Sequence, residues 1–290
     1  MSELSERFDR SIRLFGKEGQ RRLQQVSAAV VGVSGLGTPL VQQLALLGVK
    51  KLILIDPEEL DETNRNRFIG ARWDDPIPGS SKVDLSARLV REIYPDIDVI
   101  AIKSHLCTQV AFDGLYEADW VFGCLDEDGP RLVLNEFCAA YKKAYVDTAS
   151  DVPEPNVYGG RILVSLGGGG CLHCMGLLNE DDIRRFMIGE EAKHREDAIY
   201  GVDREALETT GPSVAPINAV VASLAATEFM VSVTGLREPK RLINYRGDLA
   251  RTTVSKDMPR CDCYYCNAVY GQGRSADVER YLKKTVSQHL

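Results

Sequence analysis

Apolar and polar positions along the first half of the chain predict strands that alternate with helices. Short, continuous apolar runs are typical of buried strands, and they cover residues 27–33, 50–56, 97–103, 119–124 and 144–149. Between them, apolar residues three and four positions apart predict amphipathic helices over residues 37–48, 82–94, 110–117 and 130–142. Alternation of this kind forms parallel sheets. The expected fold class is therefore α/β, a doubly wound, mainly parallel, Rossmann-like sheet.

The segments on either side of this region follow other patterns. Residues 8–25 predict one or two amphipathic helices ahead of the first strand. After Asp147 the rhythm changes. A strand is expected over 158–166, and an exposed, densely charged crossing loop with short helices is expected over 177–208. The remaining elements are a long apolar helix over 213–235, antiparallel strands near 239–246 and 251–256, and a C-terminal helix over 275–288.

A glycine-rich turn follows the first predicted strand. It reads Gly32-Val33-Ser34-Gly35-Leu36-Gly37, and apolar residues return at helical spacing directly after it. The backbone N–H groups of such a turn and the amino-terminal end of the next helix favour a bound phosphate. The second predicted strand ends at Asp56, at the spacing where an acid usually holds a ribose hydroxyl. These features predict a nucleotide site.

Four polar residues beyond Asp56 indicate which nucleotide is bound. They are Asn64, Arg67, Lys82 and Asp126. Two cations, an amide and a carboxylate suit a triphosphate with a metal ion better than a nicotinamide. Asp126 follows an apolar strand at the edge of the sheet where ligands bind, and a carboxylate there can hold Mg²⁺. Two simpler roles stay open: a helix cap for Asp126, which Asp128 can also supply, and a surface position for Lys82.

Two Cys-x-x-Cys pairs predict a structural zinc site. Cys171 and Cys174 form the first pair, and Cys263 and Cys266 form the second. Four thiolates close a tetrahedral Zn²⁺ site and leave no open position for catalysis. The alternative is two unrelated pairs, one of them redox active. Cys261 offers a different ligand, although the spacing favours Cys263, and His173 is expected to be a solvated loop residue.

Composition narrows the class of protein. The chain has 290 residues, 44% of them hydrophobic, which suffices for one large α/β core. Its formal net charge of −7 argues against nucleic acid as a partner. We expect no membrane span, because no apolar run is expected to approach the roughly twenty residues that a span needs. We expect no signal peptide, because residues 1–13 are charged and lack its apolar stretch. We therefore expect a cytoplasmic protein, whose paired cysteines bind metal rather than form disulfides.

Together these motifs resemble the ubiquitin-activating-enzyme-like adenylyltransferases of the ThiF, MoeB and HesA type, above all the bacterial homodimeric enzymes that serve sulfur carriers. The resemblance covers nearly the whole chain. Its motifs, in order, are Arg7 to Arg10, Gly32 to Gly37, Asp56 to Arg67, Lys82, Asp126 with Arg131 and Asn135, Gly211 to Pro216, and the paired cysteines. Two positions depart from the family pattern: Ser34 replaces the middle glycine, and Glu127 stands where the family often has Asn.

The resemblance implies a reaction in which a C-terminal glycine carboxylate attacks the α-phosphate of ATP. The substrate would be a ubiquitin-like or sulfur-carrier protein that ends in Gly-Gly, and the products an acyl-adenylate and pyrophosphate. Its cofactors would be ATP, Mg²⁺ and Zn²⁺. Asp56 would fix the ribose, Arg67 and Lys82 the phosphates, and Asp126 the Mg²⁺. The protein would be a homodimer in which Arg10 reaches the partner's site. A conjugating enzyme or a sulfurtransferase would accept the product.

The resemblance also divides the chain, residues 1–290, into the parts of one adenylation domain. These are an N-terminal helical arm (1–26), a nucleotide-binding core (27–150), a segment with the crossover loop, zinc knuckles and C-terminal strands (151–273), and a C-terminal helix (274–290). Three other functions stay open: an NAD-dependent oxidoreductase, a non-catalytic subunit of a heterodimeric activating enzyme, and adenylation of a non-protein carboxylate.

Overall fold

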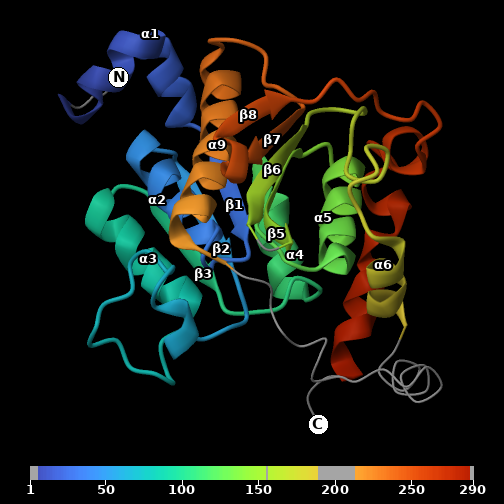
Figure 1. Ribbon diagram of the computed structural model, residues 1–290, viewed down its shortest axis with the longest axis horizontal. Coiled ribbons are helices and arrows are strands. Elements are labelled where there is room, and N and C mark those ends of the chain that lie inside the picture. Colours follow the sequence, from blue (N-terminus) through green and yellow to red (C-terminus); the bar gives the residue numbers. More distant parts are fainter. Residues whose placement is uncertain (1–5, 155, 189–212, 288–290) are drawn as a thin grey trace.

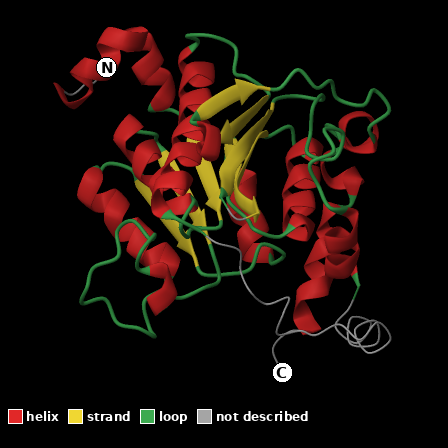
Figure 2. Ribbon diagram, in the orientation of Figure 1, coloured by secondary structure: helices red, strands yellow, loops and turns green. Residues whose placement is uncertain are grey.

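One eight-stranded sheet with helices on both faces forms the centre of the computed structural model (Figures 1 and 2). The structure describes residues 6–154, 156–188 and 213–287. Across the sheet the strands follow the order β3-β2-β1-β4-β5-β6-β7-β8. Their bounds are Ser27–Val31 (β1), Lys51–Ile55 (β2), Asp98–Ile102 (β3), Trp120–Gly123 (β4), Ala144–Glu154 (β5), Val157–Ser165 (β6), Leu242–Arg246 (β7) and Arg251–Val254 (β8).

The sheet is parallel from β3 to β5 and antiparallel from β5 to β8. This mixed Rossmann-like arrangement confirms the predicted fold class. β5 runs five residues beyond the predicted end at 149, because its second half pairs with β6 as far as Glu154.

Alternate residues of each central strand face opposite layers of helices. Ala28 and Val30 of β1 belong to one apolar cluster, with α1 (Asp9–Leu23), α2 (Gly37–Leu47), α3 (Lys82–Ile93) and α9 (Ala215–Thr234). Ala29 and Val31 belong to the other, with α4 (Gln109–Glu117) and α5 (Asp128–Ala140). α6 (Glu180–Met187) packs on α5. The period of two along the strands thus separates two hydrophobic cores.

The order of the strands reverses next to β1. The chain builds β1, β2 and β3 in one direction and then places β4 on the other side of β1. In open α/β sheets, ligands bind outside the carboxyl ends of the strands at this point of reversal. The glycine-rich turn after β1 and the Asp126 loop after β4 therefore flank the position where a ligand is expected.

α9 corrects the expectation that no apolar stretch reaches the length of a membrane span. It has 20 residues and a mean hydropathy of 1.5, so by length and composition it is long and apolar enough to cross a membrane. In the structure it packs against α1, α2, β5 and β6. Its Glu228 is buried and paired with Arg237 at 2.6 Å. These contacts are those of the core helix of a globular sheet, although length and composition alone also fit a span.

The C-terminal segment differs from the predicted helix over 275–288. It forms two 3-10 helices, Gly273–Ala276 and Val278–Ser287, separated by Asp277 with φ +52°. The buried side chains Val278 and Tyr281 lie three residues apart, which matches the three-residue turn of a 3-10 helix. Within the charged segment 177–208, α6 bears out one short helix, and residues 189–208 lie outside the described part of the chain.

Candidate functional site

The turn after β1 is closed by two contacts that require glycine. Gly32 has φ +87°, and a Cβ atom there would lie 2.5 Å from the carbonyl oxygen of Cys124. A Cβ atom at Gly37 would lie 2.0 Å from the carbonyl oxygen of Gly32. Ser34, which replaces the middle glycine, is half-buried and its carbonyl accepts from the Thr38 amide at 2.9 Å. The turn therefore folds tightly against the loop that follows β4, with serine accommodated.

Asp56 ties the turn to the end of β2. Its carboxylate is 5% exposed and accepts from the Val33 amide at 2.7 Å and the Glu58 amide at 2.9 Å. Burial raises the pKa of Asp56, and these two N–H donors oppose that shift. The predicted ribose-binding acid is thus placed beside the glycine turn.

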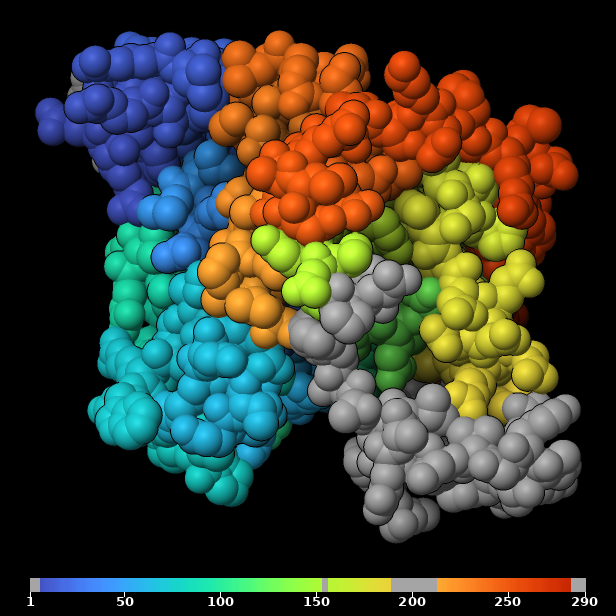
Figure 3. All heavy atoms as spheres, in the orientation of Figure 1, coloured from blue at the N-terminus to red at the C-terminus, as the bar shows by residue number. Residues whose placement is uncertain are grey.

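Asn64 and Arg67 lie in the segment between β2 and α3, which appears cyan in Figure 3 beside the orange α9. Asn64 is buried, and its Oδ1 accepts from the Asp61 amide at 3.3 Å in a reciprocal cap of the 3-10 helix Glu62–Asn64. The stem of Arg67 reaches the glycine turn, since its Cδ lies 2.9 Å from the position of a Cβ on Gly35. The structure thus gives Asn64 a local structural role and brings Arg67 to the turn.

Lys82 is not a surface lysine. It is the first residue of α3 and is 2% exposed. Its ammonium pairs with the carboxylate of Glu58, a residue that the sequence motifs did not single out. Glu58 lies two positions after Asp56, and this proximity along the chain was the signal available for finding it. The structure therefore places Lys82, Glu58 and Asp56 in one connected group.

Asp126 is exposed in the loop between β4 and α5. That loop meets the turn at Cys124, whose carbonyl faces Gly32 and whose amide donates to Val31 at 2.8 Å. Asp128 does not cap α5; the cap position belongs to Glu127, without a side-chain hydrogen bond. The carboxylate of Asp128 instead accepts from Arg131 at 2.9 Å and from the amide of Asn179 at 2.7 Å.

A buried group of charged residues around Asp147, in the first half of β5, was not predicted from the sequence. Asp147 is fully buried, and one of its oxygens lies 3.2 Å from Arg131 and 3.0 Å from Arg161. The predicted motif residue Arg131 also donates to the carbonyl of Thr148 at 3.1 Å. Asn135 accepts from the amide of Leu172 at 3.0 Å. These contacts join the first half of β5 to α5 and β6, and they join the first cysteine pair to α5.

One further residue beside the turn was missed. Asn218 of α9 is fully buried, and its Nδ2 lies 2.9 Å from the position of a Cβ on Gly35. It also donates to Ser213 Oγ at 2.9 Å. No motif around this position predicted the contact, because α9 follows the turn by about 180 residues (Gly35 to Asn218) and only the packing of α9 on the sheet brings them together.

Arg10 is not brought to the site of its own chain. It is exposed on α1, two residues after Phe8. Phe8 packs on Gly48, three residues before β2 begins, and edge-on against Tyr94 at a centroid distance of 5.7 Å. Gly48 therefore marks the amino-terminal edge of the sheet, and the glycine turn lies at the opposite, carboxyl edge.

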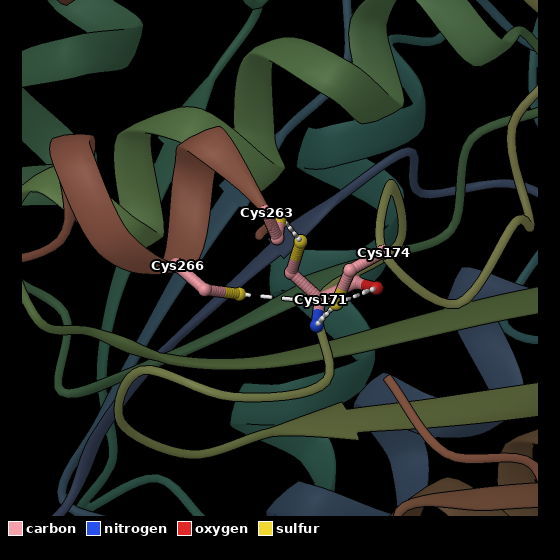
Figure 4. A group of neighbouring side chains, drawn as sticks. All are labelled: Cys171, Cys174, Cys263 and Cys266. Atoms are coloured by element: carbon pink, nitrogen blue, oxygen red, sulfur yellow. Dashed lines mark hydrogen bonds between the residues drawn. The ribbon is translucent and has the colours of Figure 1, made fainter. Parts of the chain in front are cut away.

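The four paired cysteines come together (Figure 4). Cys171 and Cys263 have their sulfur atoms 3.6 Å apart, Cys174 and Cys266 have theirs 3.8 Å apart, and all four lie within 4.8 Å of one another. A tetrahedral Zn²⁺ with Zn–S bonds of about 2.3 Å requires sulfur–sulfur distances of about 3.8 Å. These separations far exceed a disulfide bond of about 2.05 Å. The donor set and its spacing fit zinc.

The environment of the thiols also fits a cation. Burial raises the pKa of Cys171, and it raises that of Cys266 to about 11. At Cys263 burial also raises the pKa, but hydrogen bonds outweigh burial and lower it. A metal ion bound by the four sulfur atoms would stabilise their thiolates. Cys261 lies outside the group and is exposed. His173 is half-buried against Tyr265 rather than solvated, and its Nδ1 is 3.9 Å from the Cys263 sulfur.

The chain belongs to the ThiF family, whose model matches residues 8–265. The match covers both the nucleotide-site residues described above and three of the four paired cysteines, all but Cys266. The family is part of the superfamily that includes the ubiquitin-activating enzymes, and its members include adenylyltransferases that use ATP with Mg²⁺.

Three curated relatives illustrate the range of the family. Protein HesA of Leptolyngbya boryana is 28% identical over 96% of this chain and 92% of its own length. The sulfur carrier protein ThiS adenylyltransferase of Escherichia coli is 27% identical over 80% of this chain and 83% of its own. The tRNA threonylcarbamoyladenosine dehydratase of Bacillus subtilis is 29% identical over 70% of each.

Proposed function

We propose that this protein adenylates the C-terminal glycine carboxylate of a ubiquitin-like or sulfur-carrier protein, with ATP as the co-substrate. One observation carries the proposal: the buried ammonium of Lys82 is linked through Glu58 to Asp56, which binds the glycine turn. A nicotinamide site has no use for a buried lysine beside the phosphate-binding turn. A triphosphate, by contrast, needs fixed positive charge at that place.

Each residue of the group then has a role in the reaction. Asp56 accepts hydrogen bonds from the ribose, and the amides of the turn hold the phosphates. Lys82 and Arg67 neutralise phosphate charge as pyrophosphate leaves. Asp126, exposed beside the turn, would hold Mg²⁺, which adds further positive charge at the phosphates when it is bound. A carboxylate is a weak nucleophile, so the rate depends on positioning and on this charge neutralisation.

The cysteine group has a structural role in this proposal. Cys171, Cys174, Cys263 and Cys266 would hold one Zn²⁺ with no position open to substrate. The metal would join the chain segment after β6 to the segment after β8. The burial of three of the four cysteines and the sulfur distances given above support this assignment.

The relatives support two kinds of substrate. The ThiS adenylyltransferase acts on a sulfur carrier, as its name says, and the tRNA dehydratase acts on a modified tRNA nucleoside. The formal net charge of −7 disfavours a tRNA-sized polyanion, so we place the protein carrier first. An oxidoreductase or a non-catalytic subunit would leave Lys82 and Arg67 without a role at the turn.

The direct test is exchange of labelled pyrophosphate into ATP. We expect the full chain to catalyse exchange with small ubiquitin-like proteins from its own source that end in Gly-Gly. The matched control is the same protein without its last glycine, which should give background exchange. Exchange driven by a tRNA nucleoside and by none of the carriers would redirect the proposal to that substrate, and NAD reduction without exchange would refute it.

The position of Arg10 leads to a prediction about the assembly. We expect a homodimer in which Arg10 of one subunit completes the site of the other, because α1 carries it to the edge of the sheet opposite its own turn. Mixing an Arg10→Ala chain with a Lys82→Ala chain should restore about a quarter to a half of the wild-type exchange, since one site of each mixed dimer is intact. Exchange that stays at background in the mixture, with mixed dimers shown by mass, would contradict it.

The cysteines lead to a prediction about the step after adenylation. We expect no thioester between this chain and its carrier. Cys107 and Cys138 are buried. Cys124 is half-buried against the core, and burial raises its pKa to about 12. A nucleophilic thiol needs exposure and a lowered pKa. A non-reducing gel after incubation with ATP and carrier should show no adduct; a thiol-sensitive adduct, first tested with Cys261→Ser because Cys261 is exposed, would refute the prediction.

A further inference from the structure

The ion pair between Lys82 and Glu58 is unequal in its exposure to water. The lysine side chain is 2% exposed, whereas the glutamate side chain is 65% exposed. A buried ammonium without an anionic partner is strongly unfavourable. An exposed carboxylate, by contrast, is hydrated on its own at little cost. Separation of the pair is therefore expected to turn the glutamate side chain into the solvent. The lysine stays, near the carboxylates of Asp56 and Asp61, and takes another anion.

The main chain holds both residues in place while this happens. The Lys82 amide donates to the carbonyl of Glu58 at 3.0 Å. The Glu58 amide donates to Asp56 Oδ1 at 2.9 Å. The backbone of Glu58 is thus fixed between the start of α3 and the end of β2. A change of partner for Lys82 needs only a new rotamer of the Glu58 side chain, which for exposed residues occurs within nanoseconds.

We propose that Glu58 is a positioning residue that holds the Lys82 ammonium before ATP binds and is displaced by the triphosphate. The inference rests on the proposed function, because it takes ATP as the incoming anion. The carboxylate and the phosphates compete for one ammonium, and the more highly charged triphosphate prevails. The glutamate keeps the buried lysine charged and oriented in the free protein. It also weakens ATP binding, because the lysine–phosphate interaction that forms on binding replaces the existing ion pair between Lys82 and Glu58.

The neighbouring residue provides a matched control. Glu59 is also paired with a lysine, Lys103, at 2.6 Å, but both of those side chains are substantially exposed, at 38% and 47%. Glu58→Gln and Glu59→Gln remove the same charge from adjacent positions of the same loop. Only Glu58→Gln removes the negative charge that is paired with a buried ammonium. A general effect of net charge on nucleotide binding would appear in both variants.

The experiment measures MgATP and adenosine binding to the full chain by calorimetry. We expect Glu58→Gln to bind MgATP about fivefold more tightly than the wild type, since a charged hydrogen bond to the ammonium becomes a neutral one. Adenosine, which has no phosphate, should bind equally to the wild type and to Glu58→Gln. Glu59→Gln should match the wild type for both ligands. In pyrophosphate exchange, the KM for ATP of Glu58→Gln should fall more than its kcat, which a general loss of folded structure would not produce.

Two outcomes would overturn the inference alone. The first is a wild-type chain that binds MgATP and a Glu58→Gln chain that binds it equally or more weakly. The second is a Glu58→Gln chain that needs more Mg²⁺ for the same ATP affinity, because Glu58 would then be a metal ligand. A wild-type chain that binds no MgATP would refute the proposed function together with this inference. Thermal unfolding of both variants shows that they are folded before binding is measured.

Discussion

Lys82→Ala is expected to reduce ATP–pyrophosphate exchange by at least about a hundredfold, the loss typical when one charged or donor group is removed from a transition state. The ammonium is buried at the start of α3, where water cannot replace it. Asp126→Ala should cause a comparable loss through the metal ion. Exchange kinetics at saturating ATP measure both effects.

Lys103→Ala is the matched control for the lysine, because Lys103 is an exposed lysine paired with the adjacent Glu59. It should retain wild-type exchange. The circular dichroism spectra of all three variants should match that of the wild type. If Lys82→Ala or Asp126→Ala keeps the wild-type rate, that residue does not belong to the site.

We expect one tightly bound zinc ion per chain, and we expect its removal to have the second large effect. Cys263→Ser should abolish stoichiometric zinc binding and lower the melting temperature by more than about 5 °C, because the binding energy of a structural metal contributes directly to folding. Metal analysis after dialysis and thermal unfolding measure the two effects.

Cys261→Ser serves as the control for this substitution, since Cys261 lies two positions away and outside the group of four. It should keep both the zinc and the melting temperature. Wild-type protein without zinc, or a Cys263→Ser chain with unchanged metal content and stability, would refute the structural metal site.

The central strands of the sheet could be predicted from the sequence because their apolar runs record burial directly. β1 to β4 each lie inside the predicted ranges. β1, β2 and β4 are buried along nearly their whole length, and a parallel strand covered on both faces needs apolar side chains at nearly every position. β3 is an edge strand and is mostly half-buried, but it keeps an apolar run. The glycine turn could be predicted for a similar reason: Gly32 and Gly37 occupy places where a Cβ would collide with backbone. The division of the chain into one domain with four parts stays a prediction.

The remaining features of the site depend on contacts that no local pattern records. From the sequence alone, a surface position for Lys82 stays open. In the structure its side chain is buried and pairs with Glu58, which lies in the segment between β2 and α3. Asn218 reaches the turn only through the packing of α9 on the sheet. The ion group around Asp147 joins residues from α5, β5 and β6. These pairings depend on three-dimensional neighbours, so the sequence offered at most a hint of them, such as the position of Glu58 two residues after Asp56.

The group of four cysteines has a consequence for how much this chain can vary. Its two halves are 92 positions apart, and between them lie the charged crossing segment and α9. A metal ion held by both halves would cross-link the chain across this segment, and the loop-closure entropy of such a cross-link grows only with the logarithm of the segment's length. Extra residues within this segment would therefore cost little stability.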